Sequence, residues 1–252
     1  MPDDLENYVW SHRPRFDAVL DYISEVASSS RGTELKILEI GAHPFVFTRE
    51  ILDNFPAAEV YCIGAGDRPP EVKTFDESEV EIRYCNVEED DWPFDENTFD
   101  VVTMMAIIEH LFDPLSALWE AQRVLRQDGT FLLTVPNAVS LFSRSHAIKG
   151  TNPYDGYPLE SIYNRHNHEY TREEVKDLLP VAGLYPTDIQ MLNQNRIWVL
   201  PRIVQYLSRF WPNLRDQIVL KAHKAEPIDR LPIVYRQGVT ESTETHPILE
   251  SR

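Results

Sequence analysis

Apolar positions along the chain follow two spacings, one typical of amphipathic helices and one typical of buried strands. Between Pro14 and Val26 apolar side chains recur every three or four residues, which predicts a helix. Short apolar runs bounded by polar or glycine positions predict buried strands. The predicted strands cover residues 36–40, 59–63, 80–85, 99–104, 130–135, 185–192 and 217–222. Helical patterns separate most of them, and one of these is expected to run through residues 50–54.

Two of the separating helices have a local start signal. Asp113 before Pro114 supplies an N-cap acceptor and a proline at the first helical position. Thr171 and Glu174 have the spacing of a capping box. Alternating strands and helices predict an α/β fold, a Rossmann-like, doubly wound sheet of seven mostly parallel strands with helices on both faces. Ligands are expected beyond the carboxyl ends of the strands.

The chain length allows one main domain with additions at its ends. We expect an N-terminal helical segment over residues 1–35 and the α/β domain over residues 36–225. Residues 138–170 interrupt its alternation as an insertion. Residues 226–252 form a polar, turn-rich tail in which only 231–235 has strand character.

The formal net charge of −17 disfavours a nucleic-acid-binding face, which needs clustered Lys and Arg. An acidic enzyme acting on small molecules fits better. Most of the 24 basic residues are arginine, a habit found in proteins of halophilic microbes and also in ordinary acidic bacterial proteins. Cys62 and Cys85 lie in apolar runs and are expected to be free core thiols. No apolar run is long enough for a transmembrane helix, and the N-terminus lacks the pattern of a signal peptide.

The most informative segment runs from Asn86 to Asn137 and resembles the central part of class I S-adenosylmethionine-dependent methyltransferases that modify small molecules. The motifs that carry the resemblance stand in the family's order over about fifty residues. They are Asn86, Trp92-Pro93-Phe94, Phe99-Asp100, Glu109-His110-Leu111, Asp113-Pro114, Arg123-Val124-Leu125, Asp128-Gly129 and Pro136-Asn137. A weaker resemblance extends from about residue 36 to residue 224. It implies S-adenosyl-L-methionine as the cofactor.

The first cofactor motif is only half present. Leu38 to Gly41 matches its start, and the resemblance assigns Glu39, Gly41, Ala42 and His43 to the cofactor. In the family further glycines let the backbone approach the cofactor. Here His43 and Phe45 stand at those positions. This departure leaves open a weakened or differently shaped site, or a degenerate protein that only binds.

The remaining cofactor contacts follow the second, third and fourth strands. The family's acid after the second strand is missing because Gly64 stands there, and Asp67 is the candidate replacement. The resemblance places Asn86 at the adenine amino group and Val87 against the ring. It also assigns Met104, at the end of the fourth strand, to the cofactor.

Two histidines are the candidate catalytic residues. His110 follows the fourth strand, where relatives bring residues close to the transferring methyl group, and His166 matches a histidine before the helix that begins at Thr171. Either imidazole could act as general base for an acceptor hydroxyl. A structural histidine at a helix end is the alternative for His110. His166 and His168 alone, without a placed carboxylate, do not predict a metal site.

The acceptor is expected to contact the segment of residues 142–170, which is basic and aromatic in an otherwise acidic chain. Its candidate contacts are Arg144, Tyr154, Tyr163, Arg165 and His168. Such groups suit a polar, anionic acceptor such as a sugar acid. The sequence therefore favours an O-methyltransferase that acts on a sugar, for instance a hexuronic acid, of a glycan or lipid-linked glycan precursor.

Two rival functions remain. A methyltransferase of quinone or secondary-metabolite synthesis would have a more apolar acceptor segment, and a degenerate methyltransferase fold could serve as a binding subunit. We expect a cytoplasmic protein, with contact at the membrane surface left open because the acceptor could be lipid-linked. The sequence does not indicate an oligomeric state.

Overall fold

The structure is a computed structural model that describes residues 2–30, 34–65, 80–151, 166–194 and 210–225. Its centre is a seven-stranded sheet in the order β3-β2-β1-β4-β5-β7-β6. All neighbouring pairs are parallel except those with β7, which runs antiparallel to β5 and β6. The strands are β1 (Lys36–Ile40), β2 (Glu59–Ala65), β3 (Glu81–Cys85), β4 (Phe99–Met105), β5 (Leu125–Pro136), β6 (Leu184–Leu192) and β7 (Gln217–Lys224).

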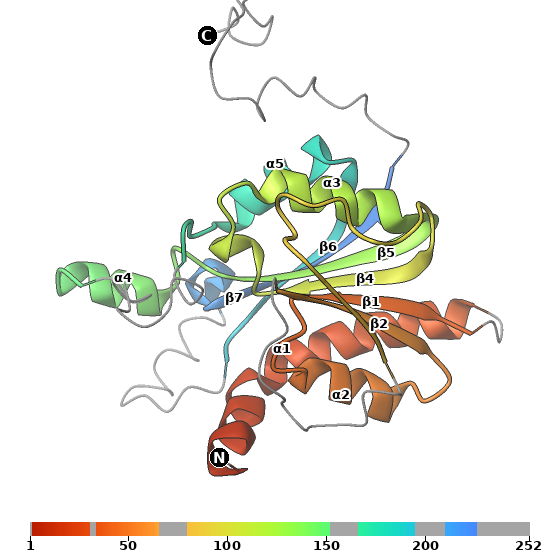
Figure 1. The fold of residues 1–252 in the computed structure, drawn as a ribbon. Coiled ribbons are helices and arrows are strands. Elements are labelled where there is room, and N and C mark those ends of the chain that lie inside the picture. The colour runs from red at the N-terminus through yellow and green to blue at the C-terminus, as the bar shows by residue number, and fades with distance from the viewer. Residues whose placement is uncertain (1, 31–33, 66–79, 152–165, 195–209, 226–252) are drawn as a thin grey trace, which may run out of the picture.

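Helices cover both faces of the sheet, so the predicted three-layer α/β architecture is confirmed (Figure 1). Helices α1 (Pro2–Ser29) and α2 (Val46–Asn54) lie on one face, and α3 (Pro114–Val124) and α5 (Arg172–Val181) lie on the other. Strand β1 shows how the sequence builds the two layers. Ile37 packs in the core on the α1 side, whereas Leu38 and Ile40 pack in the core on the α3 side.

Both predicted helix caps are present. The Asp113 carboxylate accepts a hydrogen bond from the Ser116 amide at 3.4 Å, with Pro114 at the start of α3. At α5 the Thr171 hydroxyl accepts from the Glu174 amide at 3.2 Å, and the Glu174 carboxylate accepts from the Thr171 amide at 2.7 Å. Each cap pairs amides that the first helical turn would otherwise leave without a partner.

The N-terminal helix is longer than predicted. It begins at Pro2 and passes through Pro14, which the apolar spacing had placed at its start. A proline removes one backbone hydrogen bond, but here Tyr8 and Val9 pack against the core and hold the preceding turns in place. Helix α2 begins at Val46 and includes the predicted residues 50–54, and residues Leu141–Ile148 of the predicted insertion form helix α4. The strand character of 231–235 lies outside the described residues.

Side chains from α1 connect it to α2 on the same face and to the sheet. The Arg13 guanidinium donates to both carboxylate oxygens of Glu50 in α2, at 2.9 and 2.8 Å. The Tyr22 hydroxyl donates to Asp188 of β6 at 2.6 Å. Burial and this contact raise the pKa of Tyr22. Helix α1 is therefore fixed across the sheet and can supply side chains to a site at its edge.

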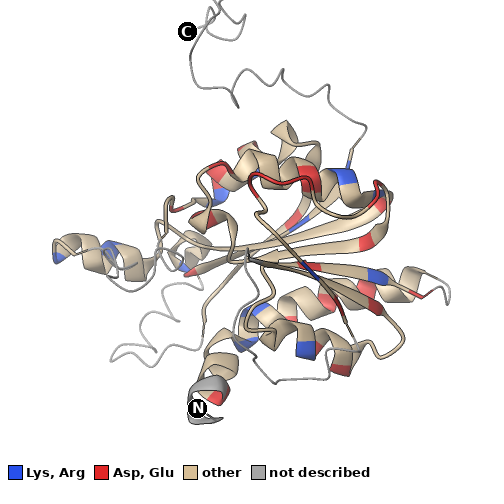
Figure 2. Ribbon diagram, in the orientation of Figure 1, with Lys and Arg blue, Asp and Glu red and all other residues tan. Residues whose placement is uncertain are grey.

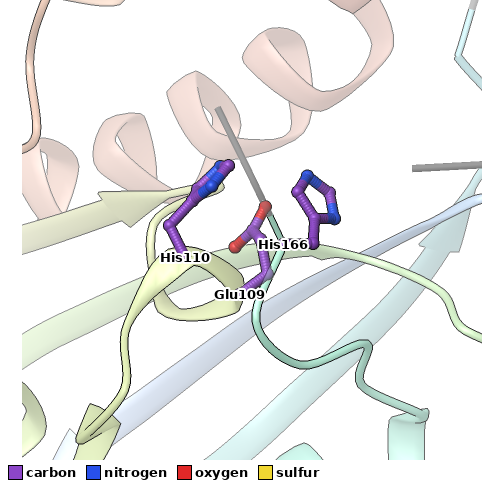
Figure 3. A group of neighbouring side chains, drawn as sticks. All are labelled: Glu109, His110 and His166. Carbon is purple, nitrogen blue, oxygen red and sulfur yellow. The ribbon is translucent and has the colours of Figure 1, made fainter. Parts of the chain in front are cut away.

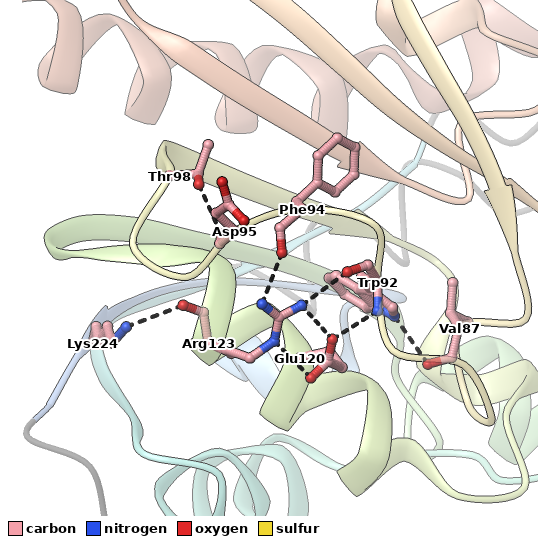
Figure 4. Close-up of polar contacts among 8 residues, drawn as sticks. All are labelled: Val87, Trp92, Phe94, Asp95, Thr98, Glu120, Arg123 and Lys224. Atoms are coloured by element: carbon pink, nitrogen blue, oxygen red, sulfur yellow. Dashed lines mark hydrogen bonds and ion pairs between the residues drawn. The ribbon is translucent and has the colours of Figure 1, made fainter.

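Arg123, at the end of α3, organises the connection between β3 and β4 (Figure 4). Its guanidinium donates to the carbonyls of Phe94 and Trp92, at 2.8 and 3.0 Å, and forms two contacts with the buried carboxylate of Glu120 at 2.9 and 2.7 Å. The Trp92 indole donates to the carbonyl of Val87 at 3.2 Å. This network explains why Glu120 and Arg123 lie one helical turn apart in α3. It also fixes the loop that follows β3.

Acidic residues lie over the outer helices and the connecting loops, with basic residues interspersed (Figure 2). The helices that the structure describes include none long and apolar enough to cross a lipid bilayer. Cys62 and Cys85 are both buried free thiols, as predicted.

We predict that Arg123→Ala lowers the free energy of unfolding by about 3 kcal/mol, because it leaves the Glu120 carboxylate buried without its cation. Arg126→Ala is the matched control. Arg126 pairs with Asp100 at the surface, and its loss should cost less than about 1 kcal/mol. Urea unfolding of both variants tests this prediction, and equal losses would contradict it.

Candidate functional site

A cavity of about 870 Å³ opens at the carboxyl ends of the central strands. Its walls come from the loops after β1, β3 and β4, from α1 and α2, and from the segment before α5. This is the position where open α/β sheets bind ligands, because the connections on either side of β1 leave the sheet on opposite faces. Its volume lies in the range of sites for small molecules and cofactors.

The loop after β1 forms one wall. Gly41 has φ +68°, and its amide donates to the Ile63 carbonyl of β2 at 2.8 Å. A β-carbon at Gly41 would meet the side chain of Ile107 at 2.2 Å, so this position requires glycine for both backbone and space. Ala42 and His43 also line the cavity. Burial lowers the pKa of His43.

Phe45 has a left-handed backbone conformation that glycine adopts more readily. Its φ is +63° and its ψ is +23°, which is a left-handed conformation that non-glycine residues rarely adopt. The ring is buried in the core on the α1 side, and this packing offsets a backbone cost on the order of 1 kcal/mol. The altered motif therefore retains a turn that glycine would make without strain.

Glu39 lies at the end of β1, with its carboxyl group on the α2 side of the sheet. The Thr48 hydroxyl of α2 donates to Glu39 Oε2 at 2.5 Å, and Glu39 is 4% exposed. Desolvation raises the pKa of Glu39 to about 8, and the hydrogen bond from Thr48 only partly counteracts this rise. A buried carboxyl group that lines a cavity can bind a cationic ligand group.

Asn86 and Val87 follow β3 on the next wall of the cavity. The Asn86 side-chain oxygen accepts from the Glu88 amide at 3.1 Å, and its backbone amide donates to Asp90 at 2.7 Å. These bonds, with the Trp92 contact to Val87, fix the loop against β3. Gly64 of β2 lies beside it, where a β-carbon would meet the ring of Tyr84 at 2.7 Å. The Tyr84 ring thus occupies the space into which a side chain at this strand end would project.

Met104 does not line the cavity, although the sequence assigns it to the cofactor. It is fully buried in the core on the α3 side. Met105 lines the cavity instead, since successive side chains of a strand point to opposite faces. Asp67 lies outside the described residues.

Three polar side chains meet on one wall of the cavity (Figure 3). Glu109 and His110 belong to the short 3-10 helix η2 (Ile108–His110) after β4, and His166 comes from the segment before α5. The rings of His110 and His166 lie edge to face, with centroids 4.7 Å apart. Nδ1 of His166 donates to Glu169 at 2.7 Å. The structure thus brings the two candidate catalytic histidines together.

Glu109 was not among the residues assigned from the sequence. It is 1% exposed, and neither of its carboxylate oxygens has a hydrogen-bond partner among the other residues that the structure describes. Burial raises its pKa to about 7, while its own backbone amide and the charges of His166 and Arg15 oppose this rise. Arg15 lines the same cavity, with Tyr8 and His12 of α1. Tyr8, His12 and Arg15 are spaced so that all three lie on one face of a helix. This spacing was the sequence signal that could have predicted this wall of the cavity.

Two candidate acceptor contacts lie away from the cavity lining. Arg144 is in α4 and donates to the Val139 carbonyl at 2.8 Å. The His168 ring packs against Tyr170 and lies 3.8 Å from Glu174. Tyr154, Tyr163 and Arg165 lie outside the described residues.

Comparison with known proteins identifies the family. A family model described as a methyltransferase domain matches residues 9–189. The chain belongs to this methyltransferase-domain family.

It is 32% identical over 109 residues to an S-adenosylmethionine-dependent methyltransferase of Mycolicibacterium smegmatis, which covers 43% of this chain and 37% of that protein. It is 26% identical over 148 residues to one of Mycobacterium tuberculosis, covering 59% of this chain and 47% of the relative. The chain thus spans less than half the length of these curated relatives.

Solved structures have the same fold. A Burkholderia thailandensis 1,6-didemethyltoxoflavin-N1-methyltransferase, solved with bound S-adenosylhomocysteine, has a TM-score of 0.52 at 20% identity, covering 88% of this methyltransferase-domain chain and 87% of that one. The structure of a complex between the Haloferax volcanii Trm112 methyltransferase activator and a methyltransferase has a TM-score of 0.56 at 16% identity, with 86% and 97% covered. At such identities the likeness establishes a Rossmann-like methyltransferase fold.

We predict that Glu39→Gln stabilises the ligand-free protein at alkaline pH. The pKa of Glu39 rises from about 4.5 to about 8 on folding, so its contribution is fully present below pH 4.5 and is lost as the pH rises toward 8. Glutamine removes this loss, and the variant should gain about 1 kcal/mol per pH unit over the wild type between pH 5 and pH 7. Denaturant unfolding across this range measures the gain, with the exposed Glu89→Gln as control. A gain independent of pH would refute the assignment.

Proposed function

We propose that this methyltransferase-domain protein binds S-adenosyl-L-methionine in the cavity and transfers its methyl group to an oxygen of a small polar acceptor. The observation that carries the proposal is the arrangement of two sets of residues around one cavity. Glu39, Gly41 and Asn86 line one part of it, and Glu109, His110 and His166 line another. A donor and an acceptor can therefore be held side by side, which is the main requirement of an in-line methyl transfer.

The residues present fit this cofactor. The buried Glu39 carboxyl group suits the ammonium of its methionine end, and the turn at Gly41 lets backbone approach. The Asn86 side chain can pair with the adenine amino group while Val87 packs against the ring. When bound, the cofactor supplies a methyl group on a sulfonium that any correctly placed nucleophile can accept. We place Ala42 and His43 at this end of the cavity with them.

The other part of the cavity acts on the acceptor. A hydroxyl group must lose its proton as its oxygen accepts the methyl group. His110 and His166 are next to each other on the wall, and in the simplest form one imidazole accepts this proton. The contact with Glu169 holds His166 in one orientation.

We further propose a sugar, such as a hexuronic acid of a glycan or glycan precursor, as the acceptor. This proposal rests on the basic and aromatic composition of residues 142–170, and on Arg15, a cationic group on the cavity wall that suits a carboxylate. A quinone or similar apolar acceptor is the second candidate, favoured by the apolar side chains of Met105, Ile107 and Leu111 in the same lining.

We predict that S-adenosylmethionine binds with a micromolar dissociation constant in calorimetric titration, and that Asn86→Ala weakens it by about tenfold through loss of one hydrogen bond. Glu39→Gln should weaken it further, because glutamine cannot ionise to pair with the ammonium. Asn97→Ala, outside the cavity lining, is the control. Absence of binding at millimolar cofactor would reject the enzyme and favour a degenerate fold.

We also predict that His110→Ala and His166→Ala each lower the rate of methyl transfer by about 100-fold while cofactor affinity is kept. Transfer of labelled methyl groups to uronic-acid oligosaccharides and to a quinol compares the two acceptor classes. His223→Ala, at the exposed end of β7, is the control for loss of a histidine. Full activity in both variants would remove the histidines from the mechanism.

A further inference from the structure

We propose that Glu109, His110 and His166 form a binding site for one divalent transition-metal ion on the wall of the cavity. Each offers one ligand atom, and these atoms all lie within 4.8 Å of one another. Figure 3 shows the carboxylate and both imidazole rings projecting into the same space. The sequence alone pointed away from a metal because it paired His166 with His168. The fold pairs it with His110 instead and adds the carboxylate.

The carboxylate of Glu109 is the observation that calls for a ligand. It is 1% exposed and lines the cavity, and within the described part of the chain neither oxygen has a hydrogen-bond partner on another residue. Buried polar groups nearly always have a partner, since an unpaired one costs several kcal/mol. Arg15 and His166 attract it electrostatically. A cation bound directly between Glu109 and the imidazoles would occupy the lone pairs that these more distant charges leave without a bond.

The surroundings hold the three groups in place without an ion. The Asn167 amide donates to the Glu109 carbonyl at 2.6 Å, and its side chain donates to the His110 carbonyl at 2.5 Å. These bonds fasten the segment before α5 to η2. Metal-ligand distances of about 2.1 Å place ligand atoms about 3 to 3.5 Å apart. Side-chain rotation that moves the atoms together by at most about 1 to 2 Å is therefore sufficient.

Glu169 completes the arrangement behind His166. Metal-bound histidines commonly donate their second ring nitrogen to a carboxylate, which fixes the tautomer and strengthens the ligand. Nδ1 of His166 lies 2.7 Å from Glu169 Oε1, so Nε2 is the nitrogen with which His166 would bind an ion. This contact distinguishes the cluster from a chance meeting of surface groups.

The ligand types indicate the class of ion. Two imidazoles and one carboxylate suit zinc, cobalt, iron or manganese, whereas magnesium and calcium prefer oxygen ligands throughout. Three protein ligands leave coordination positions open toward the cavity. The use of these positions rests on the proposed function. An acceptor hydroxyl bound there would lose its proton to solvent more readily, so that no imidazole would be needed as the base, and its oxygen would then form the bond to the methyl group as the bond to sulfur breaks.

The test is binding of Co²⁺ to the untagged full chain after removal of metals with a chelator. We expect saturable binding of one equivalent, seen in the visible absorption of the ion. Glu109→Gln keeps the size of the side chain and should weaken binding by at least tenfold, as should His166→Ala. Glu169→Gln should weaken it by about 10- to 100-fold through loss of its hold on His166. His168→Ala, two residues further along, should leave binding unchanged.

Circular dichroism and thermal unfolding of each variant show whether it is folded. Absence of saturable Co²⁺ binding overturns the inference, and so does binding that Glu109→Gln leaves intact, which would make Glu109 a charge partner of Arg15 alone. S-adenosylmethionine titrations on the same preparation separate the two proposals. Cofactor binding without Co²⁺ binding removes the metal site only, and Co²⁺ binding without cofactor binding removes the methyltransferase proposal only.

Discussion

The cavity exists because the chain connections on the two sides of β1 leave the sheet on opposite faces. Strand β1 pairs with β2 on one side and with β4 on the other, and the helices that follow lie on opposite faces of the sheet. No helix can cover the carboxyl end of the sheet at that point. The loops after β1, β3 and β4 therefore turn away from each other and leave the space that Glu39, Asn86 and Glu109 line. These three residues lie near that space because of the order of the strands in the sheet.

Two carboxyl groups lie buried at this space, and both cost stability when ionised without a ligand. Of the residues that the structure describes, Thr48 donates a hydrogen bond to Glu39, and no other residue donates one to the Glu109 carboxylate. Burial raises the pKa of both. Packing elsewhere, such as the Arg123 and Glu120 network, offsets this cost. Binding of a cation removes this cost of the buried carboxylates. The ligand-free protein is therefore less stable than the cation-bound protein.

The sequence predicted the architecture well because strand runs and capping residues are local signals. The capping box at Thr171 and the proline at the start of α3 needed only neighbouring residues. Features that depend on distant contacts were harder to predict. Helix α1 passes through Pro14 because Tyr8 and Val9 pack on the core, and neither its length nor its part in the cavity follows from local spacing. Met105 rather than Met104 lines the cavity because the direction of a side chain depends on which face of the sheet the cavity occupies.

The site was predictable where one strand end decides the position. Gly41 and Asn86 each follow a strand directly, His110 lies in η2 shortly after β4, and all three line the cavity. The meeting of His166 with Glu109 depends on the hydrogen bonds from the backbone and side chain of Asn167 to η2, which no periodic pattern reveals. The roles of these residues remain predictions.

The left-handed conformation of Phe45 bears on how such proteins are found. A glycine-rich motif stands for a set of backbone dihedral angles. Here a phenylalanine adopts a left-handed conformation of the kind that glycine favours, because its ring is anchored in the core. Loops of this kind can differ in sequence while they share a backbone conformation. Surveys that score glycine spacing will overlook them, whereas surveys of backbone angles at the end of the first strand will include them. The same loop also shows that a large side chain can take over a position that has lost glycine, provided that the side chain points away from the ligand.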